Sequence, residues 1–419
     1  MAKKDDKKSR YFWNAPEVPE SSHSKNKIKE SHKTLNIGFI GVGGMGIMSL
    51  KEIIDFEDLN IIAFADVDLS HLEDAKKIIL EKHPDADVKT FQDFRDLTKL
   101  DNIDAVIIST PDHWHIPAAI NALKNGKHVY IEKPLTLTIA EGRELVNAVK
   151  QTGLVCQAGM QQRSSTEFRL ACELIRNNKI GAVKEVNVLI PKNNVTCDKT
   201  WSTMPVPEEL DYDMWLGQTP WEEYTEQRCH YSFRFILAYS GGQMTNWGAH
   251  HLDIVQWALD MDHSGPVAVS GTGIFPEEGL FDTAKEIDLL YEYADGTKVT
   301  CKTADTRGIE FIGSKGKVNV RRGEIKTEPE NLVDETFDHE NDIQLYVSTN
   351  HYQNFFDCVR QNRTPVATAE IGHRSATLCH LGNIAMKLNR KLQWNPKIEQ
   401  FINDDEANSM LSRPPRKTF

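Results

Sequence analysis

Glu132 and Lys133 are the residues of this chain whose types and position point most clearly to chemistry. They follow the apolar run His128–Ile131, which predicts a buried strand, and Pro134 restrains Lys133 to extended geometry. Charged side chains at a strand end contribute little to packing, whereas open α/β sheets bind ligands at the carboxyl ends of their strands. A partly desolvated lysine there has a lowered pKa and can take a proton from a hydroxyl near neutral pH. A solvated charge pair at a loop edge is the alternative.

A glycine-rich turn near the start of the sequence indicates which kind of ligand lies beside this lysine. The residues Gly41, Gly43, Gly44, Met45 and Gly46 form a G-x-G-x-x-G pattern between a predicted strand, Leu35–Ile40, and a predicted helix, Ile47–Asp55. Such glycines allow a tight turn and close approach of a pyrophosphate to a helix N-terminus. An ordinary tight turn is the other interpretation of the glycines alone.

An acidic residue strengthens the nucleotide interpretation. Asp66 ends the next predicted strand, Asn60–Ala65, about 20 residues beyond the glycines, where a carboxylate accepts hydrogen bonds from the adenosine ribose. A negative charge there repels a 2′-phosphate, and Val67 and Asp68 supply no arginine to bind one. The sequence therefore predicts NAD(H) rather than NADP(H) as the cofactor.

The segment Thr110–His115 follows another predicted strand, Ala105–Ser109, at the same edge of the sheet. Thr110, Pro111 and an aromatic ring are expected to wall the nicotinamide side of the cleft. Two histidines, His113 and His115, lack a nearby cysteine or second acidic ligand, so we expect packing and hydrogen bonding rather than metal binding.

The order of predicted elements indicates two domains. Strands and amphipathic helices alternate over residues 35–157, which predicts a doubly wound parallel sheet, that is, a Rossmann domain. Residues 158–395 contain strand-like runs joined by turn signals such as Asp295-Gly296, which predict an α+β domain with a large, mostly antiparallel sheet. Residues 1–34 are expected to be a flexible extension and 396–419 a C-terminal tail.

Composition narrows the possible partners. The 419 residues carry a formal charge of −12, which argues against nucleic acid and favours neutral or cationic small molecules. Three further features are expected of a cytoplasmic protein. The seven cysteines are scattered without a C-x-x-C pair, no apolar run has the length of a membrane span, and the N-terminus has no hydrophobic signal.

Taken in order, these motifs resemble the Gfo/Idh/MocA oxidoreductases, the family of glucose-fructose oxidoreductase and inositol dehydrogenase. A further match is the segment 241–253, which is similar to the family's glycine-rich stretch leading into Asp-x-Gly-x-His-x-x-Asp. The resemblance implies that Lys133 and His250 are the catalytic residues and that Asn246 stands where the family usually has aspartate. Asparagine cannot accept a proton, so a mechanism that needs a carboxylate there is in doubt.

The resemblance also implies further contacts and an assembly. Gln161 and Arg163 are placed where the family lines its cleft, and a homo-oligomer, a dimer or tetramer formed through the open sheet face, is expected. We expect the cofactor also to contact His115, Glu132, Lys133 and Gln161. The residues expected to bind substrate are Lys133, Arg163, Tyr239, Asn246 and His250, with Asp305 and Arg307 as weaker candidates.

Three functions fit this sequence. The leading prediction is an NAD-dependent dehydrogenase that moves a hydride between nicotinamide and a secondary hydroxyl of a sugar, glycoside or cyclic polyol. A second is a glycosidase that retains NAD and acts through transient 3-keto oxidation and elimination. A third is a nucleotide-sensing protein without activity, although a sensor would need neither Lys133 nor His250.

Overall fold

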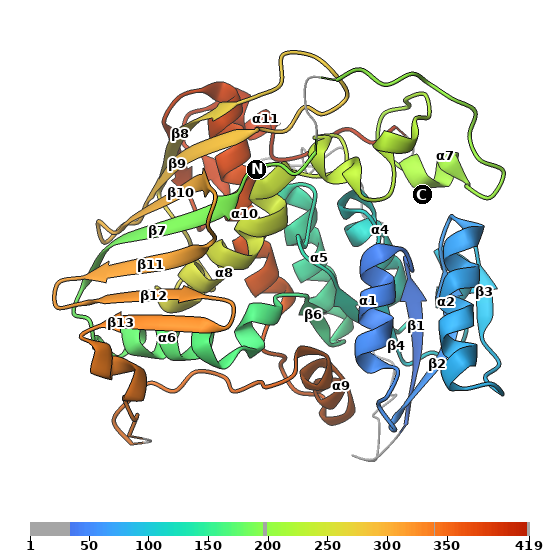
Figure 1. Ribbon diagram of the computed structural model, residues 1–419, viewed down its shortest axis with the longest axis horizontal. Helices are drawn as coiled ribbons and strands as arrows, with labels where there is room; N and C mark the ends of the chain where they lie inside the picture. The colour runs from blue at the N-terminus through green and yellow to red at the C-terminus, as the bar shows by residue number, and fades with distance from the viewer. Residues whose placement is uncertain (1–33, 196–198, 339, 417–419) are drawn as a thin grey trace, which may run out of the picture.

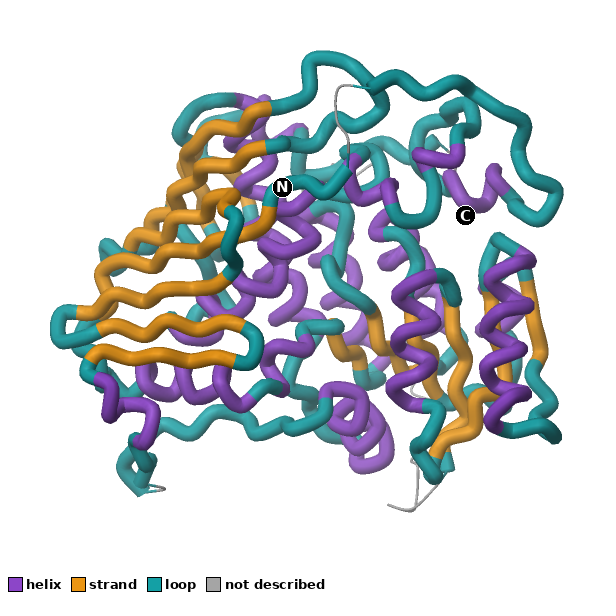
Figure 2. Tube along the Cα trace, in the orientation of Figure 1, coloured by secondary structure: helices purple, strands orange, loops and turns teal. Residues whose placement is uncertain are grey.

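The computed structural model describes residues 34–195, 199–338 and 340–416 (Figure 1). All but the last residue of the predicted N-terminal extension, 1–34, lies outside them. The described chain forms two sheets, one of six strands and one of nine, with helices between and around them (Figure 2). The predicted combination of a Rossmann sheet and a second α+β unit is confirmed.

The first sheet is entirely parallel, with strand order β3-β2-β1-β4-β5-β6. Its strands are β1 (Leu35–Ile40), β2 (Leu59–Ala65), β3 (Lys89–Phe91), β4 (Ala105–Ile108), β5 (His128–Ile131) and β6 (Cys156–Ala158). The connecting helices are α1 (Gly44–Ile53), α2 (Leu69–Lys82), α3 (Phe94–Thr98), α4 (Asp112–Lys124) and α5 (Ile139–Thr152). Consequently the glycine turn, Asp66, Thr110 and Lys133 all lie at the carboxyl edge of one sheet, as predicted.

The second sheet has the strand order β13-β12-β11-β7-β10-β9-β8-β14-β15 and is antiparallel except between β7 and β10. Its strands are β7 (Val183–Pro191), β8 (Ala268–Ile274), β9 (Glu286–Glu292), β10 (Lys298–Ala304), β11 (Gly308–Gly313), β12 (Lys317–Arg321), β13 (Glu324–Glu328), β14 (Leu392–Asn395) and β15 (Gln400–Phe401). Helices α6 (Thr166–Arg176), α8 (Ala249–Ala258) and α10 (Ala369–Leu388) pack against it. Alternating buried and exposed residues along β9 show that one face is covered and the other is open.

The two predicted domains share a core. Helix α9 (His351–Gln361) lies far along the chain, yet Tyr352, Phe355 and Phe356 pack with β1 and β5 of the first sheet. Tyr352 also donates a hydrogen bond from its hydroxyl to Ser49 on α1 at 2.7 Å. The division at residue 157 therefore separates segments that are packed together.

The predicted C-terminal tail is folded as far as residue 416. It contributes β15 and α11 (Asp405–Ser409), and Arg416 donates to carbonyls of Thr219 and Gly217 beside α7 (Tyr212–Leu216). None of the described helices has the length and apolar character needed to cross a membrane.

Residues 210–240 lie over the carboxyl edge of the first sheet. This segment, here called the roof, contains α7 and two short 3₁₀ helices, η2 (Glu226–Arg228) and η3 (Ser232–Phe235). Its aromatic residues form a small core of their own, and the Trp114 indole of α4 donates to the Met214 carbonyl at 2.9 Å. The roof covers part of the open sheet edge and lines one side of a pocket there.

Candidate active site

The pocket under the roof begins at the glycine turn. Gly41 has a φ of +83°, and a Cβ there would lie 2.7 Å from the Thr110 backbone nitrogen. A Cβ on Gly46 would lie 2.2 Å from the Gly41 carbonyl oxygen, so both positions require glycine. Helix α1 starts directly after this turn without a side-chain cap, which leaves its first N–H groups available to a phosphate. Gly43, Gly44 and Met45 line the pocket as predicted, whereas Gly46 supports the turn from behind.

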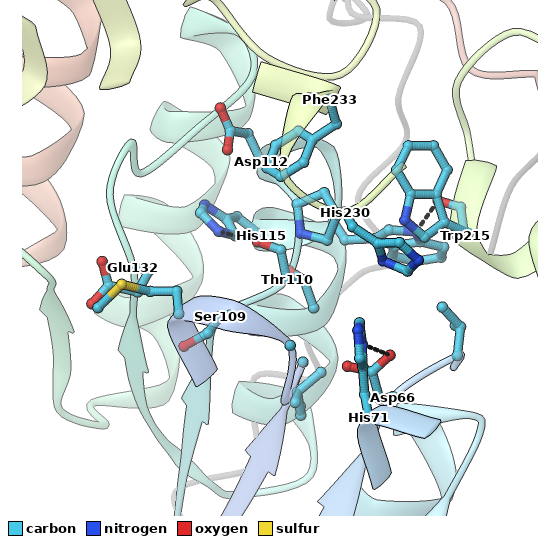
Figure 3. Close-up of a pocket in the computed structure, with 18 of the residues that line it drawn as sticks. Asp66, His71, Ser109, Thr110, Asp112, His115, Glu132, Trp215, His230 and Phe233 are labelled. Carbon is cyan, nitrogen blue, oxygen red and sulfur yellow. Dashed lines mark hydrogen bonds and ion pairs between the residues drawn. The ribbon is translucent and has the colours of Figure 1, made fainter. Parts of the chain in front are cut away.

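Asp66 lies at one end of the pocket, close to two histidines. Its carboxylate accepts hydrogen bonds from the backbone of Val42 at 2.8 Å and of Asp68 at 3.0 Å. His71 approaches it at 3.4 Å, and although burial lowers the pKa of His71, the Asp66 carboxylate raises it above its ordinary value. Figure 3 shows His71 and Asp66 together, with His230 of the roof facing them.

Asp68, His71 and His230 also bring possible ligand atoms within 4.8 Å of one another. His71 and His230 line the pocket at its Asp66 end, whereas Asp68 does not line it. The placement of the two histidines therefore fits cofactor binding, and the predicted absence of a metal remains a prediction.

The hydrogen bonding of two buried hydroxyls bears on whether a dinucleotide fits this pocket. Ser109 and Thr110 line it between Asp66 and Glu132, and both buried hydroxyl oxygens lack a hydrogen-bond partner among the described residues. Buried polar groups are normally satisfied, so these two indicate an expected ligand with donors or acceptors, which ribose and phosphate groups provide. Pro111 and Trp114 also line the pocket.

Lys133 lies at the other end of the pocket, where the two sheets' domains meet. Its Nζ donates to the Asn246 side-chain oxygen at 3.1 Å and lies 3.4 Å from the Asn246 carbonyl. Burial lowers the pKa of Lys133 below its ordinary value; Glu132 opposes the shift and Arg234 adds to it. The side chain is therefore suited to exchange a proton with a bound hydroxyl.

Glu132 is a positioning residue behind the lysine. Its carboxylate accepts from the Lys133 backbone nitrogen at 3.2 Å and from the Gln161 side chain at 2.8 Å. Burial raises the pKa of Glu132, and Lys133 partly offsets this rise. Glu132 lines the pocket but Gln161 does not; Gln161 donates hydrogen bonds to Glu132 and to the Tyr130 hydroxyl.

Asn246 and His250 come from one unusual helical segment. Residues Met244–Gly248 form a single turn of π-helix, η4, that continues into α8, and such turns are frequent at functional sites. The His250 Nδ1 atom is buried and has no partner among the described residues. Burial, with the charges of Lys133 and Arg322, holds the pKa of His250 well below 6.5, so the ring is neutral.

The buried carboxylate of Asp112 was not predicted from the sequence. Asp112 begins α4, lines the pocket and accepts a hydrogen bond from Ser240. Burial raises its pKa to about 6, although Ser240, Arg234 and Lys133 act in the opposite direction. Asp112 belongs to the segment Thr110–His115. Its hydrogen bond with Ser240 and its proximity to the charge of Arg234 depend on the roof, which the sequence pattern does not show.

The neighbouring histidines have the packing role that was predicted. The His113 Nε2 lies 2.8 Å from the Trp215 carbonyl. The His115 ring lies between the carbonyls of Pro134, at 2.7 Å, and Thr110, at 3.0 Å. His115 thereby joins the two loops that carry the pocket wall and the lysine.

Two predicted substrate contacts are corrected by their placement. Arg163 is 1% exposed and forms ion pairs with Asp253 at 2.8 Å and Asp262 at 2.7 Å, so its guanidinium is used inside the second domain. Tyr239 is fully buried in the roof, where its ring packs against Trp215 and its hydroxyl accepts from Arg228. Neither residue lines the pocket.

Sequence comparison finds curated relatives that match part of this chain. An alpha-N-acetylgalactosaminidase of Shewanella oneidensis is 31% identical over 170 residues, which are 39% of this chain and 37% of the relative. A glycosyl hydrolase family 109 protein of Shewanella woodyi is 30% identical over 169 residues, 39% and 36% of the two chains. The match thus spans little more than a third of these relatives' length.

Structural comparison extends over most of the chain. The WlbA dehydrogenase of Bordetella pertussis, solved with NADH and UDP-GlcNAcA, is 17% identical with a TM-score of 0.65, over 87% of this chain and 99% of that one. The scyllo-inositol dehydrogenase of Lactobacillus casei, solved with NAD(H) and scyllo-inositol, is 21% identical with a TM-score of 0.61, over 86% and 99%. At these identities the likeness establishes the fold.

Two family models match the chain itself. Residues 35–160 match the NAD-binding Rossmann fold of the oxidoreductase family, and residues 182–419 match its C-terminal alpha/beta domain. The matches cover both sheets and include Lys133, Asn246 and His250. The chain therefore belongs to the Gfo/Idh/MocA oxidoreductase family.

Proposed function

We propose that this protein oxidises or reduces a secondary hydroxyl of a sugar, glycoside or cyclic polyol with NAD(H). The observation that carries the proposal is the position of Lys133, whose Nζ lies at the end of the nucleotide pocket, against Asn246 of the second domain. When bound, the nicotinamide supplies or accepts the hydride. Gly43, Gly44, Asp66 and the Ser109 and Thr110 hydroxyls are the groups that would hold the dinucleotide.

The protein's own part in the reaction is to place the hydroxyl and move its proton. In oxidation, the unprotonated Lys133 amine takes the hydroxyl proton; in reduction, its ammonium returns one to the carbonyl oxygen. Asn246 orients the reacting hydroxyl or its neighbour by hydrogen bonding. His250, which is neutral, accepts or donates a further hydrogen bond, and Asp112 is a second group that can hold a proton near the lysine.

A second candidate keeps the same first step within a glycosidase. The relatives called alpha-N-acetylgalactosaminidase and glycosyl hydrolase family 109 protein favour it. Oxidation of the sugar at C3 acidifies the C2 proton, so a base can remove it while the glycosidic oxygen leaves. Water then adds, and re-reduction of C3 restores the sugar with no net change in the cofactor. The roof over the pocket supports a cofactor that is retained between turnovers.

One assay separates the two candidates. Purified protein is incubated with NAD and a panel of sugars, glycosides and inositols, and NADH absorbance is recorded together with release of the free sugar or aglycone. Accumulation of NADH supports the dehydrogenase, whereas cleavage without NADH supports the glycosidase. If NAD binds but neither signal occurs with any member of a broad panel, the catalytic proposal fails and a sensing role is favoured.

Neither candidate requires a metal ion. Although Asp68, His71 and His230 are close enough together to hold one, we assign the two histidines to the ribose end of the cofactor. Dialysis against a chelator is therefore expected to leave turnover within about twofold of the untreated enzyme. Loss of turnover that zinc or another divalent cation restores would contradict this assignment, and a His230→Ala variant would locate the ion.

A further inference from the structure

A second pocket is lined in part by Trp247, the residue after Asn246 in the π-helical turn η4. It has a volume of about 720 Å³, within the usual range for small-ligand sites. The described lining consists of side chains from η4, α8 and two turns of the second sheet: Trp247, His251, Asp305, Thr306, Arg307, Arg321, Arg322, Gly323 and Glu324. Trp247 and His251 directly follow Asn246 and His250 in the chain, and the Trp247 ring lies 5.9 Å from that of His250, so the second pocket lies beside the segment that carries both.

The charges in this pocket are predominantly positive. The guanidinium of Arg307 lies 4.2 Å from the centre of the Trp247 ring and that of Arg322 lies 4.9 Å from it. Among the described residues no carboxylate lies within ion-pair distance of either guanidinium. Both are exposed at the mouth of the pocket.

The remaining lining charges do not cancel this pair. Glu324 is bound by Arg321 and by Lys326, the latter at 2.8 Å, so its charge is already offset. Asp305 is the lining carboxylate that has no ion pair within the described part of the chain. The charge of Arg322 also lowers the pKa values of Lys133 and His250, so it acts at the Lys133 end of the nucleotide pocket.

His251 provides an independent indication that a ligand binds here. Its side chain lines the pocket and is 1% exposed, yet both ring nitrogens lack hydrogen-bond partners among the described residues. Burial, with the charges of Arg322 and Arg307, lowers the pKa of His251 to about 3, so the neutral ring offers one donor and one acceptor. A ligand in the pocket would satisfy this otherwise costly arrangement.

We propose that this pocket binds an acidic substituent of the substrate, so that the enzyme acts on an acidic sugar. The anionic group, a carboxylate, sulfate ester or phosphate ester, is placed between Arg307 and Arg322, and His251 hydrogen bonds to the same sugar. The sugar hydroxyl that reacts lies toward Lys133. The inference rests on the proposed function and specifies its substrate class; it also replaces the expectation, drawn from the net charge of −12, that neutral or cationic ligands fit best.

Binding can be measured without turnover. The NAD-loaded protein is titrated calorimetrically with matched sets of sugars that share a ring but differ in one group: the uronate, the sulfate ester, the phosphate ester and the neutral sugar. We expect at least one acidic member to bind at least about tenfold more tightly than its neutral counterpart, with an affinity that falls as salt rises. If no acidic member binds more tightly, the proposal is overturned.

Variants then locate the acidic group. Arg307→Gln is expected to weaken binding of the preferred acid at least about tenfold and that of the neutral sugar less than about twofold. Lys317→Gln, on β12 but outside the pocket lining, removes the same charge and is expected to change neither affinity. Thermal unfolding and NAD binding confirm that each variant folds. Equal loss in both variants, or a change of oligomeric state without loss of acid preference, would contradict the proposal.

Failure of this inference and failure of the proposed function give different results. Arginine-dependent binding of an acid that is neither oxidised nor cleaved would retain the pocket assignment and remove the catalytic one. Turnover of neutral sugars with no preference for acids would retain the catalytic assignment and remove the pocket assignment.

Discussion

Lys133 combines a site at the end of the cofactor pocket with a lowered pKa, and its removal should separate binding from chemistry. Because the glycine turn and Asp66 lie at the far end of the pocket, Lys133→Ala is expected to bind NAD normally, as followed by fluorescence. Turnover is expected to fall about a hundredfold or more, because a general acid–base group contributes about 10²–10⁴-fold to the rate. Near-normal turnover would remove Lys133 from the catalytic role.

The charge of Arg234 should set the pH at which this lysine works. Oxidation needs the unprotonated amine, so kcat/KM should rise with pH through the pKa of Lys133 and then level off. The groups that act on it are Glu132 and Asp112, which raise the pKa, and Arg234 and Arg322, which lower it. Removing a positive charge favours the ammonium, so Arg234→Gln should move the rising limb of the profile to higher pH.

The matched control is Arg234→Lys, which keeps the charge and should keep the limb in place. An unchanged or lower limb in Arg234→Gln would show that another group controls the profile. The reductive direction should show the opposite dependence, with activity lost as pH rises, because it needs the protonated lysine.

The single residues also show how far the sequence could be interpreted. Lys133, Asp66 and the glycines were found because strand ends and a tight turn leave a local pattern. Arg163 was predicted to line the cleft because of its place in the chain near Gln161. The sequence could not show its partners, which are Asp253 on α8 and Asp262 in the loop after α8. Asp112 is contacted by the roof, and Arg322 lies in the β12–β13 turn. Both segments are remote in sequence from the motifs around Lys133, so the sequence pattern could not place them there.

At the scale of elements, the buried ion pairs of Arg163 connect η1 (Gln161–Ser164) to α8 and thereby hold the helix that carries His250. Arg163→Met leaves the Asp253 carboxylate buried beside Ser375 without its main counter-charge. We expect the free energy of unfolding to fall by about 3–5 kcal/mol, measured by chemical denaturation.

An exposed pair provides the comparison for this prediction. Lys302 lies 3.2 Å from Asp288, with side chains 48% and 61% exposed, so Lys302→Met should cost about 1 kcal/mol or less. A raised KM in Arg163→Met with unchanged stability would instead support the substrate contact first expected from the sequence.

The strands of the first sheet were predicted well, whereas segments whose shape depends on distant contacts were not. The predicted ranges of β1 and β5 match the structure, and those of β2 and β4 agree to within a residue at each end. The π-helical turn Met244–Gly248 was not predicted, because its backbone depends on packing against α10 and the second sheet rather than on local preference. The roof was likewise not predicted, since it is held by contacts between residues remote in sequence, such as Trp114 with Met214.

At the scale of the whole molecule, α9 and the contact of α10 with α5 join the two sheets into one structure. We therefore expect both parts to unfold in one transition. Loss of NAD binding should coincide along a denaturant series with the tryptophan fluorescence change of the second domain, which contains Trp257 and Trp394.

The Phe355→Ala variant tests this coupling. Phe355 is fully buried and its ring lies 5.8 Å from that of Tyr130, so its truncation should cost about 3–5 kcal/mol. Both signals should shift together to lower denaturant. Two separate midpoints, with only the NAD signal shifted, would show that the first sheet unfolds independently.

The late position of α9 in the chain has a consequence for synthesis. The first sheet is complete at Ala158, but the helix that covers Phe39 and Tyr130 ends only at Gln361. A ribosome that adds about 5–20 residues per second needs roughly 10–40 s to make the intervening chain. During that time the nascent sheet keeps an apolar face uncovered, so we expect the cofactor domain to become stable only when the last quarter of the protein has emerged.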